Sequence, residues 1–222
     1  MAERPWTYCP TQPPITAVIL VKAPIAGHTK TRLIPALGAV GAARLHTHFL
    51  WAQARHVVAA TLGPVQFHVS QPHPVFLRLQ KRFGGRLITQ ATGDLGERLR
   101  RAVQQVSGPL LILGTDCPAL VPAQLRRAGQ LLSTHQSVMI PALDGGYVLL
   151  GGLSGSRLIN SGVFDNMPWS TDAVADITRE RLRGAGLSFA EMAPLADIDL
   201  PSDYAEWQRS ALPERQARRE PI

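Results

Sequence analysis

Short apolar segments alternate along the chain with segments whose apolar residues recur at helical spacing. Residues 16–22 form a continuous run rich in valine and isoleucine, which is typical of a strand buried on both faces of a sheet. After a loop punctuated by glycine and proline, Leu45, Phe49 and Ala52 recur on one face of a helix that ends near residue 62. The same reasoning predicts further strands over 65–70, 86–90, 110–114, 137–142, 146–150 and 187–192, and helices over 74–83, 94–106, 122–133, 171–183 and from residue 201.

Strands that alternate with helices in this order predict the α/β class. We expect a three-layer α/β/α sandwich whose mostly parallel, Rossmann-like sheet is covered by helices on both faces. Because no shift in composition divides the 222 residues, we expect one domain over 1–222, with a loose proline-rich arm over 1–14 and a tail over 212–222. The apolar runs are far shorter than the ~20 residues that cross a bilayer. No secretory leader is recognisable and only two cysteines are present, so we expect a cytoplasmic protein.

Charge is distributed unevenly between the two halves of the chain. Residues 1–93 carry ten basic groups and one acidic group, whereas residues 94–222 carry thirteen basic and fifteen acidic groups. A basic half that faces carboxylates suits a bound polyphosphate with a metal ion between them. Nucleic-acid binding or a solvated basic surface is the alternative. Aromatic residues make up only 6% of the chain and no nucleic-acid-binding module is recognisable, so we do not expect a nucleic-acid partner.

The loop after the first strand concentrates positive charge. Lys22 and Lys30 lie in it together with Arg32, although arginine supplies twenty of the 23 basic residues of the chain. An ammonium group is a compact point charge for phosphate, and Gly27 lets backbone N–H groups approach an anion. The spacing fits neither a P-loop nor a dinucleotide fingerprint. We interpret Lys22, Gly27, Lys30 and Arg32 as phosphate-binding residues, with an exposed loop that carries incidental lysines as the alternative.

A second loop follows the strand expected over 86–90. Loops after parallel strands meet at one edge of the sheet, so this loop should lie beside the first. Gln90 is a candidate for the edge of a nucleobase and Gly93 for its close approach, and Asp94 joins them in the nucleotide-binding set. Asp94 and Glu97 also have the spacing of a capping box, which is the structural alternative.

Two aspartates follow later strands. Asp116, after the strand over 110–114, offers a hard oxygen ligand for Mg²⁺ or Mn²⁺ held against phosphates, or it caps the turn that begins at Pro118. We place it among the catalytic residues. Asp144 opens an Asp-Gly-Gly-Tyr segment, which is a hairpin signal. It is also a candidate base at the reacting centre.

The remaining candidates lie in the second half of the chain. Gly145 and Gly146 offer backbone donors to a sugar or phosphate, and with Tyr147 and Trp169 they form the expected acceptor site. Trp169 either stacks on the acceptor or packs in the core. Asp199 is the candidate second metal ligand, whereas the neighbouring Asp203 fits helix-start chemistry.

Taken together, six motifs in this order resemble a bacterial glycosyltransferase-like family associated with radical-enzyme and arsenosugar genes. They are Lys-x-Pro-x-x-Gly-x-x-Lys-Thr-Arg-Leu, Gly-Asp-Leu-Gly-Glu-Arg, Gly-Thr-Asp-Cys-Pro, Asp-Gly-Gly-Tyr, Trp-Ser-Thr and Asp-Ile-Asp, within residues 16–208. The family belongs to the nucleotide-diphospho-sugar transferase superfamily. The resemblance implies a GT-A fold, a nucleotide-binding half built from the first four strands, a metal at Asp116 and an acceptor-binding second half. Leu200 departs from the threonine usual there, and Gly114 departs from the Asp-x-Asp of glycosyltransferases.

These observations lead to two enzymatic hypotheses. The first is a Mg²⁺- or Mn²⁺-dependent glycosyltransferase that uses a nucleotide-diphosphate sugar and a small-molecule acceptor. The second is a nucleotidyltransferase that joins a nucleoside triphosphate to a phosphorylated acceptor and releases pyrophosphate. The six-motif resemblance favours the first hypothesis. The paired lysines, and the single aspartate at 116 in place of Asp-x-Asp, favour the second.

Overall fold

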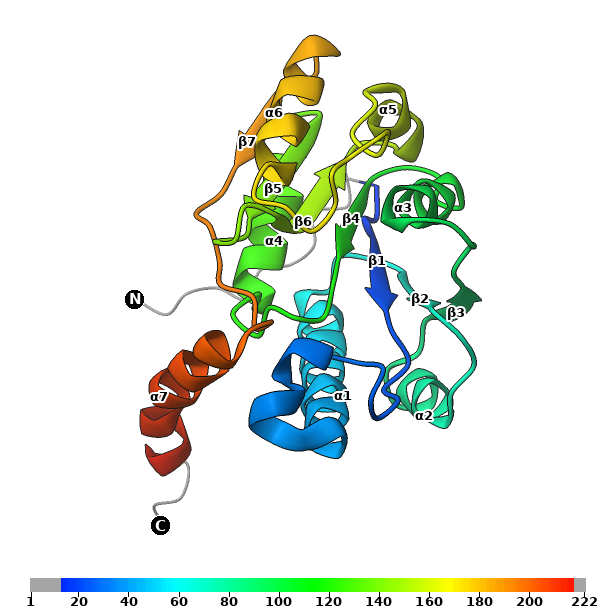
Figure 1. The fold of residues 1–222 in the computed structure, drawn as a ribbon. Coiled ribbons are helices and arrows are strands. Elements are labelled where there is room, and N and C mark those ends of the chain that lie inside the picture. The colour runs from blue at the N-terminus through cyan, green and yellow to red at the C-terminus, as the bar shows by residue number, and fades with distance from the viewer. Residues whose placement is uncertain (1–12, 218–222) are drawn as a thin grey trace, which may run out of the picture.

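The computed structural model describes residues 13–217, which form an α/β structure around a seven-stranded sheet (Figure 1). The strand order is β3-β2-β1-β4-β6-β5-β7, and β6 alone among these strands runs antiparallel to its neighbours. This confirms the mostly parallel sheet that the apolar runs predict. The strands are β1 (Thr16–Val21), β2 (Val65–Val69), β3 (Arg86–Thr89), β4 (Leu110–Leu113), β5 (Ser137–Pro141), β6 (Tyr147–Gly152) and β7 (Phe189–Glu191).

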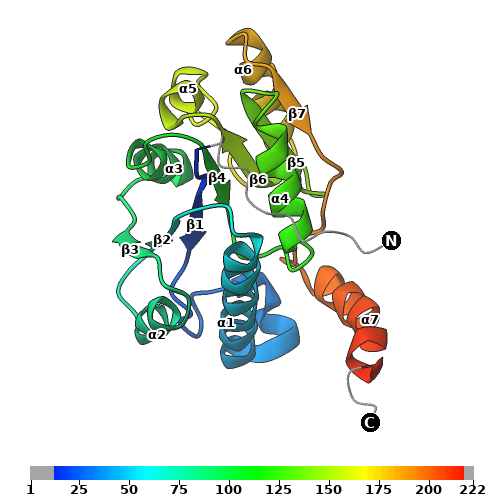
Figure 2. The ribbon, with the colours of Figure 1, turned by 180° about the vertical axis from the view of Figure 1, so that it is seen from behind.

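Helices cover both faces of the sheet, as the three-layer prediction requires (Figures 1 and 2). Three helices lie on one face: α1 (Ile34–Ala60), α2 (Pro74–Phe83) and α4 (Pro122–Leu131). Three lie on the other: α3 (Leu95–Gln104), α5 (Gly155–Asn160) and α6 (Val174–Gly184). A 3-10 turn, η1 (Thr31–Leu33), precedes α1, and α7 (Pro201–Ala217) extends away from the sheet.

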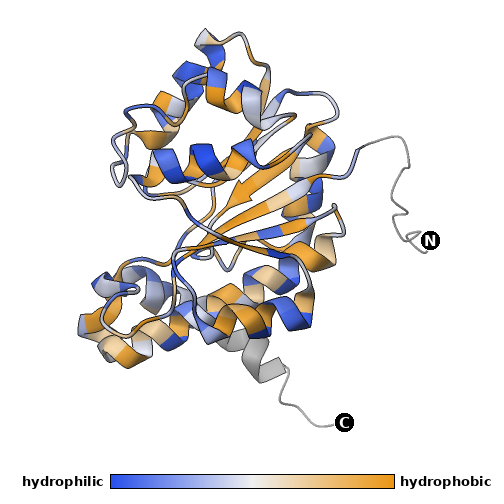
Figure 3. Cartoon of the chain, turned by 90° about the vertical axis from the view of Figure 1, so that its right-hand side faces the viewer, coloured by the Kyte–Doolittle hydropathy of each residue, from blue (hydrophilic) through white to orange (hydrophobic). Residues whose placement is uncertain are grey.

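The alternation of side chains along each strand divides the core in two. In β1, Ile19 belongs to the cluster packed against α1, α2 and α4, whereas its neighbour Val18 belongs to the cluster packed against α3, α5 and α6. Both side chains have no exposed surface. Figure 3 shows the strands as a largely hydrophobic layer between helices of mixed polarity. Burial on both faces therefore explains why the strands read as continuous apolar runs.

The carboxyl ends of β1, β3, β4 and β5 lie at the same edge of the sheet, because these strands run in one direction. The antiparallel strand β6 begins at that edge, so the turn over 142–146 also lies there. The loops predicted to carry the chemistry therefore share one edge.

A few boundaries differ from the prediction. Helix α1 begins before Gly38, which adopts a left-handed φ of 69° and kinks the helix, so part of the expected loop is helical. Helix α5 was not predicted, because its six residues are too few to show a helical period. Residues 1–12 of the expected arm and 218–222 of the expected tail lie outside the described residues, and α7 occupies the tail up to Ala217. No helix in the described part of the chain is long and apolar enough to cross a membrane.

Candidate active site

Lys30 is the most constrained residue of the first loop. Its backbone is left-handed (φ 47°), an uncommon conformation for a residue with a side chain, and its side chain is only 3% exposed. The ammonium Nζ lies 3.0 Å from Asp116 Oδ1 and donates to the Ile198 carbonyl oxygen at 2.5 Å. It also lies 5.8 Å from the centre of the Phe49 ring. Lys30 therefore joins the loop after β1 to the loop after β4 and to the segment before α7.

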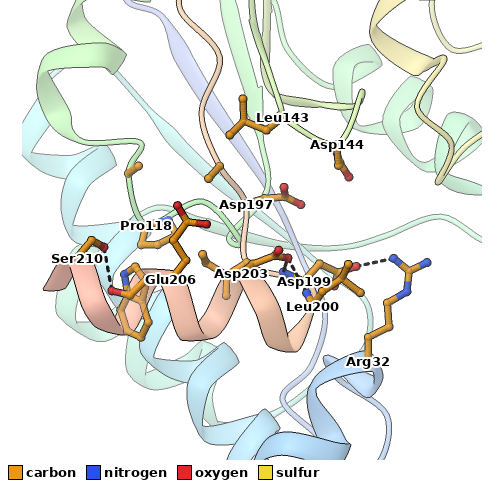
Figure 4. A pocket seen from close by; sticks show the side chains of 14 residues that line it. Arg32, Pro118, Leu143, Asp144, Asp197, Asp199, Leu200, Asp203, Glu206 and Ser210 are labelled. Atoms are coloured by element: carbon orange, nitrogen blue, oxygen red, sulfur yellow. Dashed lines mark hydrogen bonds and ion pairs between the residues drawn. The ribbon is translucent and has the colours of Figure 1, made fainter. Parts of the chain in front are cut away.

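Arg32 makes the second contact between the first loop and the acidic half, and it is exposed. Its guanidinium Nη1 donates to Asp199 Oδ2 at 2.8 Å, and the two side chains are 60% and 38% exposed (Figure 4). An exposed pair can exchange one partner for a ligand at little cost. Lys22, directly after β1, and Gly27 (φ 84°) are also exposed, although neither lines the cavities described below. Arg32, Lys22 and Gly27 thus remain available to an anion, whereas Lys30 is occupied inside the protein.

The Asp116 carboxylate carries a negative charge in this environment. Burial opposes its ionisation, but His46 and the Lys30 ammonium outweigh burial and lower the pKa of Asp116 to about 2. His46 Nδ1 lies 3.8 Å from Asp116 Oδ1, and His46 Nε2 lies 2.8 Å from the Lys22 carbonyl oxygen. The Asp116 side chain is nevertheless 45% exposed. One side of Asp116 is therefore held by the protein while the other faces solvent.

Asp116, Asp144 and Asp197 line one cavity of about 200 Å³ at the edge of the sheet. Burial and the neighbouring charges of Asp144, Asp199 and Asp116 raise the pKa of Asp197 to about 6. This shift means that the negative charge of the acidic cavity is not fully compensated within the protein. We define the space lined by these three residues as the acidic cavity.

Asp197 was missed as a site residue from the sequence. In Asp197-Ile-Asp199 the two carboxylates are equivalent as a pattern, and Asp199 was the predicted metal ligand. In the structure both Asp197 and Asp199 line an adjoining cleft of about 430 Å³, shown in Figure 4, but Asp197 also lines the acidic cavity. Asp203 accepts hydrogen bonds from the backbone N–H groups of Asp199 and Leu200, at 3.1 and 2.7 Å. Its helix-start role is therefore observed directly.

The acidic cavity fits a divalent cation that is shared with a ligand. Carboxylate oxygens are the donors that Mg²⁺ and Mn²⁺ prefer, and Mg²⁺ is usually held by one or two carboxylates together with substrate phosphates. The described residues contain no preassembled group of three or more metal-ligating side chains. The ionised Asp116 and Asp197, whose pKa is raised by burial and neighbouring carboxylates, are thus suited to bind a cation together with a phosphate.

A second cavity, of about 240 Å³, lies beside the acidic cavity and shares the Asp144–Tyr147 turn with it. Its walls come from the ends of β1 and β4, the first turn of α3, and the segment from Trp169 to Val174. The Tyr147 and Trp169 rings meet edge to face, with centres 6.4 Å apart. Burial raises the pKa of the Tyr147 hydroxyl further above its ordinary value, so the hydroxyl is neutral. We define this space as the neutral cavity, because Asp144 is the one acidic or basic residue among the described residues that line it.

The turn that separates the two cavities is rigidly built. Asp144 Oδ1 accepts from the Gly146 backbone N–H at 2.9 Å, and Gly145 has a φ of 90°, which favours glycine. A Cβ atom at Gly145 would lie 2.2 Å from the Asp172 carbonyl oxygen, and the Gly145 carbonyl oxygen accepts from Ala175 N at 2.8 Å. Asp144 and Gly146 line both cavities, so the candidate base lies at their boundary.

The second loop is tied into the protein. Gln90 Nε2 donates to the carbonyl oxygens of Val21 and His68, at 3.2 and 2.6 Å, and Gln90 Oε1 accepts from Arg98 at 3.3 Å. Its side chain links the ends of neighbouring strands, so contact with a nucleobase edge would require these bonds to be exchanged. Asp94 caps α3 by accepting from Glu97 N at 2.8 Å, which is the structural alternative recognised from the sequence. Gly93 has a φ of 110° and lines neither cavity, so a nucleotide role for this loop stays a prediction.

The chain matches a known protein family. Residues 53–171, more than half of the chain, match the family described as "Uncharacterized protein conserved in bacteria (DUF2064)". No protein with a curated description matches the chain.

Solved structures share this fold over most of their length. A protein from Desulfovibrio desulfuricans G20, provisionally described as a nucleotide-diphospho-sugar transferase, is 26% identical, with a TM-score of 0.78 over 88% of this chain and 87% of that one. A nucleotidyl transferase from Methanothermobacter thermautotrophicus is 17% identical, with a TM-score of 0.62 over 90% and 99%. A CMP-2-keto-3-deoxy-manno-octonic acid synthetase in complex with CTP is 14% identical, with a TM-score of 0.55 over 91% and 100%. The predicted superfamily is confirmed, whereas the association with radical-enzyme genes stays a prediction.

Proposed function

The chain belongs to the DUF2064 family of bacterial proteins, and we propose that it is a metal-dependent glycosyltransferase that uses a nucleotide-diphosphate sugar as donor. The observation that carries this proposal is the acidic cavity beside the cationic first loop. A diphosphate is an anionic partner for the exposed Lys22 and Arg32, and a divalent cation is a partner for the Asp116 and Asp197 carboxylates. The transferase fold of the similar structures is consistent with this assignment.

Each part of the site has a role in the proposed reaction. Lys22 and Arg32 hold the diphosphate, and the exposed Arg32 exchanges Asp199 for a phosphate oxygen. Asp116 and Asp197 hold Mg²⁺ or Mn²⁺. Asp197 takes this role in preference to Asp199, because Asp197 lines the acidic cavity and Asp199 does not. Bound there, the cation would offset the charge that develops on the leaving diphosphate.

Asp144 is the proposed base that acts on the acceptor. In an inverting transfer, the acceptor hydroxyl oxygen forms a bond to the anomeric carbon while the bond from that carbon to the diphosphate oxygen breaks. The hydroxyl proton passes to the Asp144 carboxylate, and the diphosphate leaves with the bonding electron pair. Asp144 lies at the boundary of the two cavities, so it can face the acceptor on one side and the donor on the other.

Nucleotidyl transfer is the second candidate. It is favoured by Gly114, which leaves Asp116 as the single carboxylate of its loop where glycosyltransferases usually show Asp-x-Asp. In that reaction, an acceptor phosphate oxygen attacks the α-phosphorus of a nucleoside triphosphate and pyrophosphate leaves. The two candidates differ in the donor that binds together with the metal.

A thermal-shift panel of nucleotide-sugars and nucleoside triphosphates, each with and without Mn²⁺, separates the candidates. A ligand at 100 times its dissociation constant adds about 2.7 kcal/mol of stability. In a protein of this size that corresponds to a rise in the midpoint of roughly 5–11 °C. Mn²⁺-dependent shifts with nucleotide-sugars alone support sugar transfer. A shift confined to one triphosphate supports nucleotidyl transfer, and no Mn²⁺-dependent shift with any nucleotide overturns both.

A further inference from the structure

Most side chains that line the neutral cavity are apolar, and its polar side chains come from Asp144, Tyr147, Trp169, Ser170 and Thr171. Leu20 and Ile112 come from β1 and β4, Leu95 and Leu99 from the first turns of α3, and Val174 from the start of α6. Three of these side chains, Leu99, Ile112 and Val174, are at most 5% exposed. Among residues 13–217, no lysine, arginine or histidine lines this cavity. A ligand here must therefore leave water without gaining a cationic partner.

We propose that the neutral cavity binds the acceptor, and that this acceptor is an uncharged, hydroxyl-bearing molecule with an apolar part. The proposal rests on the proposed function and specifies its second substrate. A phosphorylated acceptor is disfavoured, because transfer of an unpaired phosphate into an apolar space costs several kcal/mol. The Asp144 carboxylate would repel such a phosphate as well.

Two polar atoms in the wall support a hydroxyl-bearing ligand. The Tyr147 hydroxyl and the Trp169 ring Nε1–H are buried and have no hydrogen-bond partner among the described residues. Buried donors without a partner are rare in native proteins and costly. Both atoms are buried rather than exposed to the neutral cavity, but both belong to side chains that line it, so a ligand oxygen reaches them through a local shift of these side chains. Sugar and alcohol oxygens are acceptors for both. Aromatic rings with a polar edge are also suited to pack against an apolar face that carries hydroxyl groups.

The segment that holds Trp169 in the cavity wall contains an unfavourable backbone conformation. Ser170 has a φ of 68°, in the left-handed region that residues with side chains rarely adopt. A Cβ atom at Gly96 on α3 would lie 2.3 Å from the Phe164 carbonyl oxygen and 3.2 Å from Trp169 Nε1, so α3 packs closely against this part of the chain. Thr171 fixes the same segment by donating to the Pro168 carbonyl oxygen at 2.8 Å. These features together fix the Trp169 ring against α3, at the side of the neutral cavity.

The geometry places the attacking group of such an acceptor beside the base. Asp144 lines the neutral cavity and the acidic cavity, and Gly145 ties its turn to the segment that begins α6. A hydroxyl bound near Asp144 would thus face the side on which the donor binds. This links the chemistry of the second substrate to residues other than those that hold the metal.

The test compares n-hexyl β-glucoside with its 6-phosphate as probes, measured by isothermal titration with the full-length protein. We expect the neutral probe to bind at least tenfold more tightly than the phosphorylated one. Leu95→Lys places an ammonium group in the wall at a half-buried position, and it should reverse this preference. Thr171→Lys, at an exposed position in the same wall, is a second variant in case Leu95→Lys fails to fold. Val58→Lys on α1, 38% exposed and outside the cavity, is the matched control and should leave both affinities unchanged.

Tighter binding of the phosphorylated probe to the wild-type protein would overturn the proposal. So would failure of the neutral probe to bind, or an unchanged preference in folded Leu95→Lys and Thr171→Lys proteins. The nucleotide panel above is independent of these measurements. If the panel fails while the probe preference and its reversal are observed, the cavity assignment stands and the proposed transfer is wrong; the opposite result removes the cavity assignment alone.

Discussion

The acidic cavity and the neutral cavity share one turn, yet their polar groups are paired in opposite ways. Around Asp116 the protein supplies charge of both signs, and the buried Lys30 contacts a carboxylate at 3.0 Å. Around Tyr147 it supplies almost no charge, and two buried donors have no partner within residues 13–217. The first arrangement suits a ligand that brings charge and exchanges ion pairs. The second suits a ligand that brings oxygen atoms and apolar surface.

Removal of the Asp116 carboxylate should have the largest effect and should be confined to the acidic side. Asp116→Asn is expected to lower the Mn²⁺-dependent turnover of the donor by about 10²–10³-fold, since several kcal/mol of charge stabilisation are lost with the cation. Binding of the neutral probe should be unchanged. Asp176→Asn, on the exposed surface of α6, is the control and should retain full turnover. Equal losses in the two variants would contradict the assignment of Asp116.

The two ion pairs of the first loop should differ in their contribution to folding. Lys30→Met leaves the Asp116 charge without its buried partner, and we expect a loss of about 2–3 kcal/mol in the free energy of unfolding. Arg32→Met breaks an exposed pair and should cost less than about 1 kcal/mol, but it should weaken donor binding. Urea denaturation and titration of the donor measure the two effects. Similar stability losses would show that Lys30 is not a structural link between the loops.

The charge of Asp197 should make the stability of the protein depend on pH. Its folded-state pKa of about 6 lies above its ordinary value of 3.8, so the folded state binds more protons and loses stability as pH rises from about 4 to 6. In the presence of a chelator, Asp197→Asn should therefore melt about 2–4 °C above the wild-type protein at pH 7.5, after allowance for solvent screening. Below about pH 4 the two proteins should melt together. A difference that is independent of pH would contradict the interpretation.

The smallest effect is expected in the neutral cavity. Tyr147→Phe removes a buried hydroxyl that has no hydrogen-bond partner in the described part of the chain, so the free energy of unfolding should stay within about 0.5 kcal/mol or rise. If this hydroxyl binds the acceptor, affinity for the neutral probe should fall by about 3- to 10-fold. Donor binding should be unaffected. A large loss of stability would show that the hydroxyl has a structural partner.

The fold could be predicted from the sequence better than the contacts within the candidate site. Continuous apolar runs and helical periodicity predicted the seven strands and most helices, because burial on both faces imposes these patterns. The loops carrying Lys30, Asp116 and Asp144 were also predicted to meet at one edge. Burial of the Lys30 side chain could not be foreseen, since it depends on a contact with Ile198, distant in sequence.

The choice between Asp197 and Asp199 shows the same limit. Both carboxylates precede the same helix, and only the direction in which the chain passes the sheet edge decides which one faces the acidic cavity. The residue type and position of Gln90 indicated contact with a nucleobase as well as any other role. In the structure, its side-chain amide donates to carbonyl oxygens of two strands. A possible signal for Asp197 was the group of three aspartates at 197, 199 and 203, of which Asp203 is used in capping.

The reversed direction of β6 has a consequence for how this enzyme family can diversify. Leu113 pairs with Leu149 across the β4–β6 ladder, so backbone hydrogen bonds act as a ruler between the loop of Asp116 and the turn of Asp144. Changes in the Trp169 segment or at the start of α3 can then reshape the neutral cavity without altering the spacing between Asp116 and Asp144. If these two residues have the proposed roles, new specificity can evolve on one wall while the distance between them is kept.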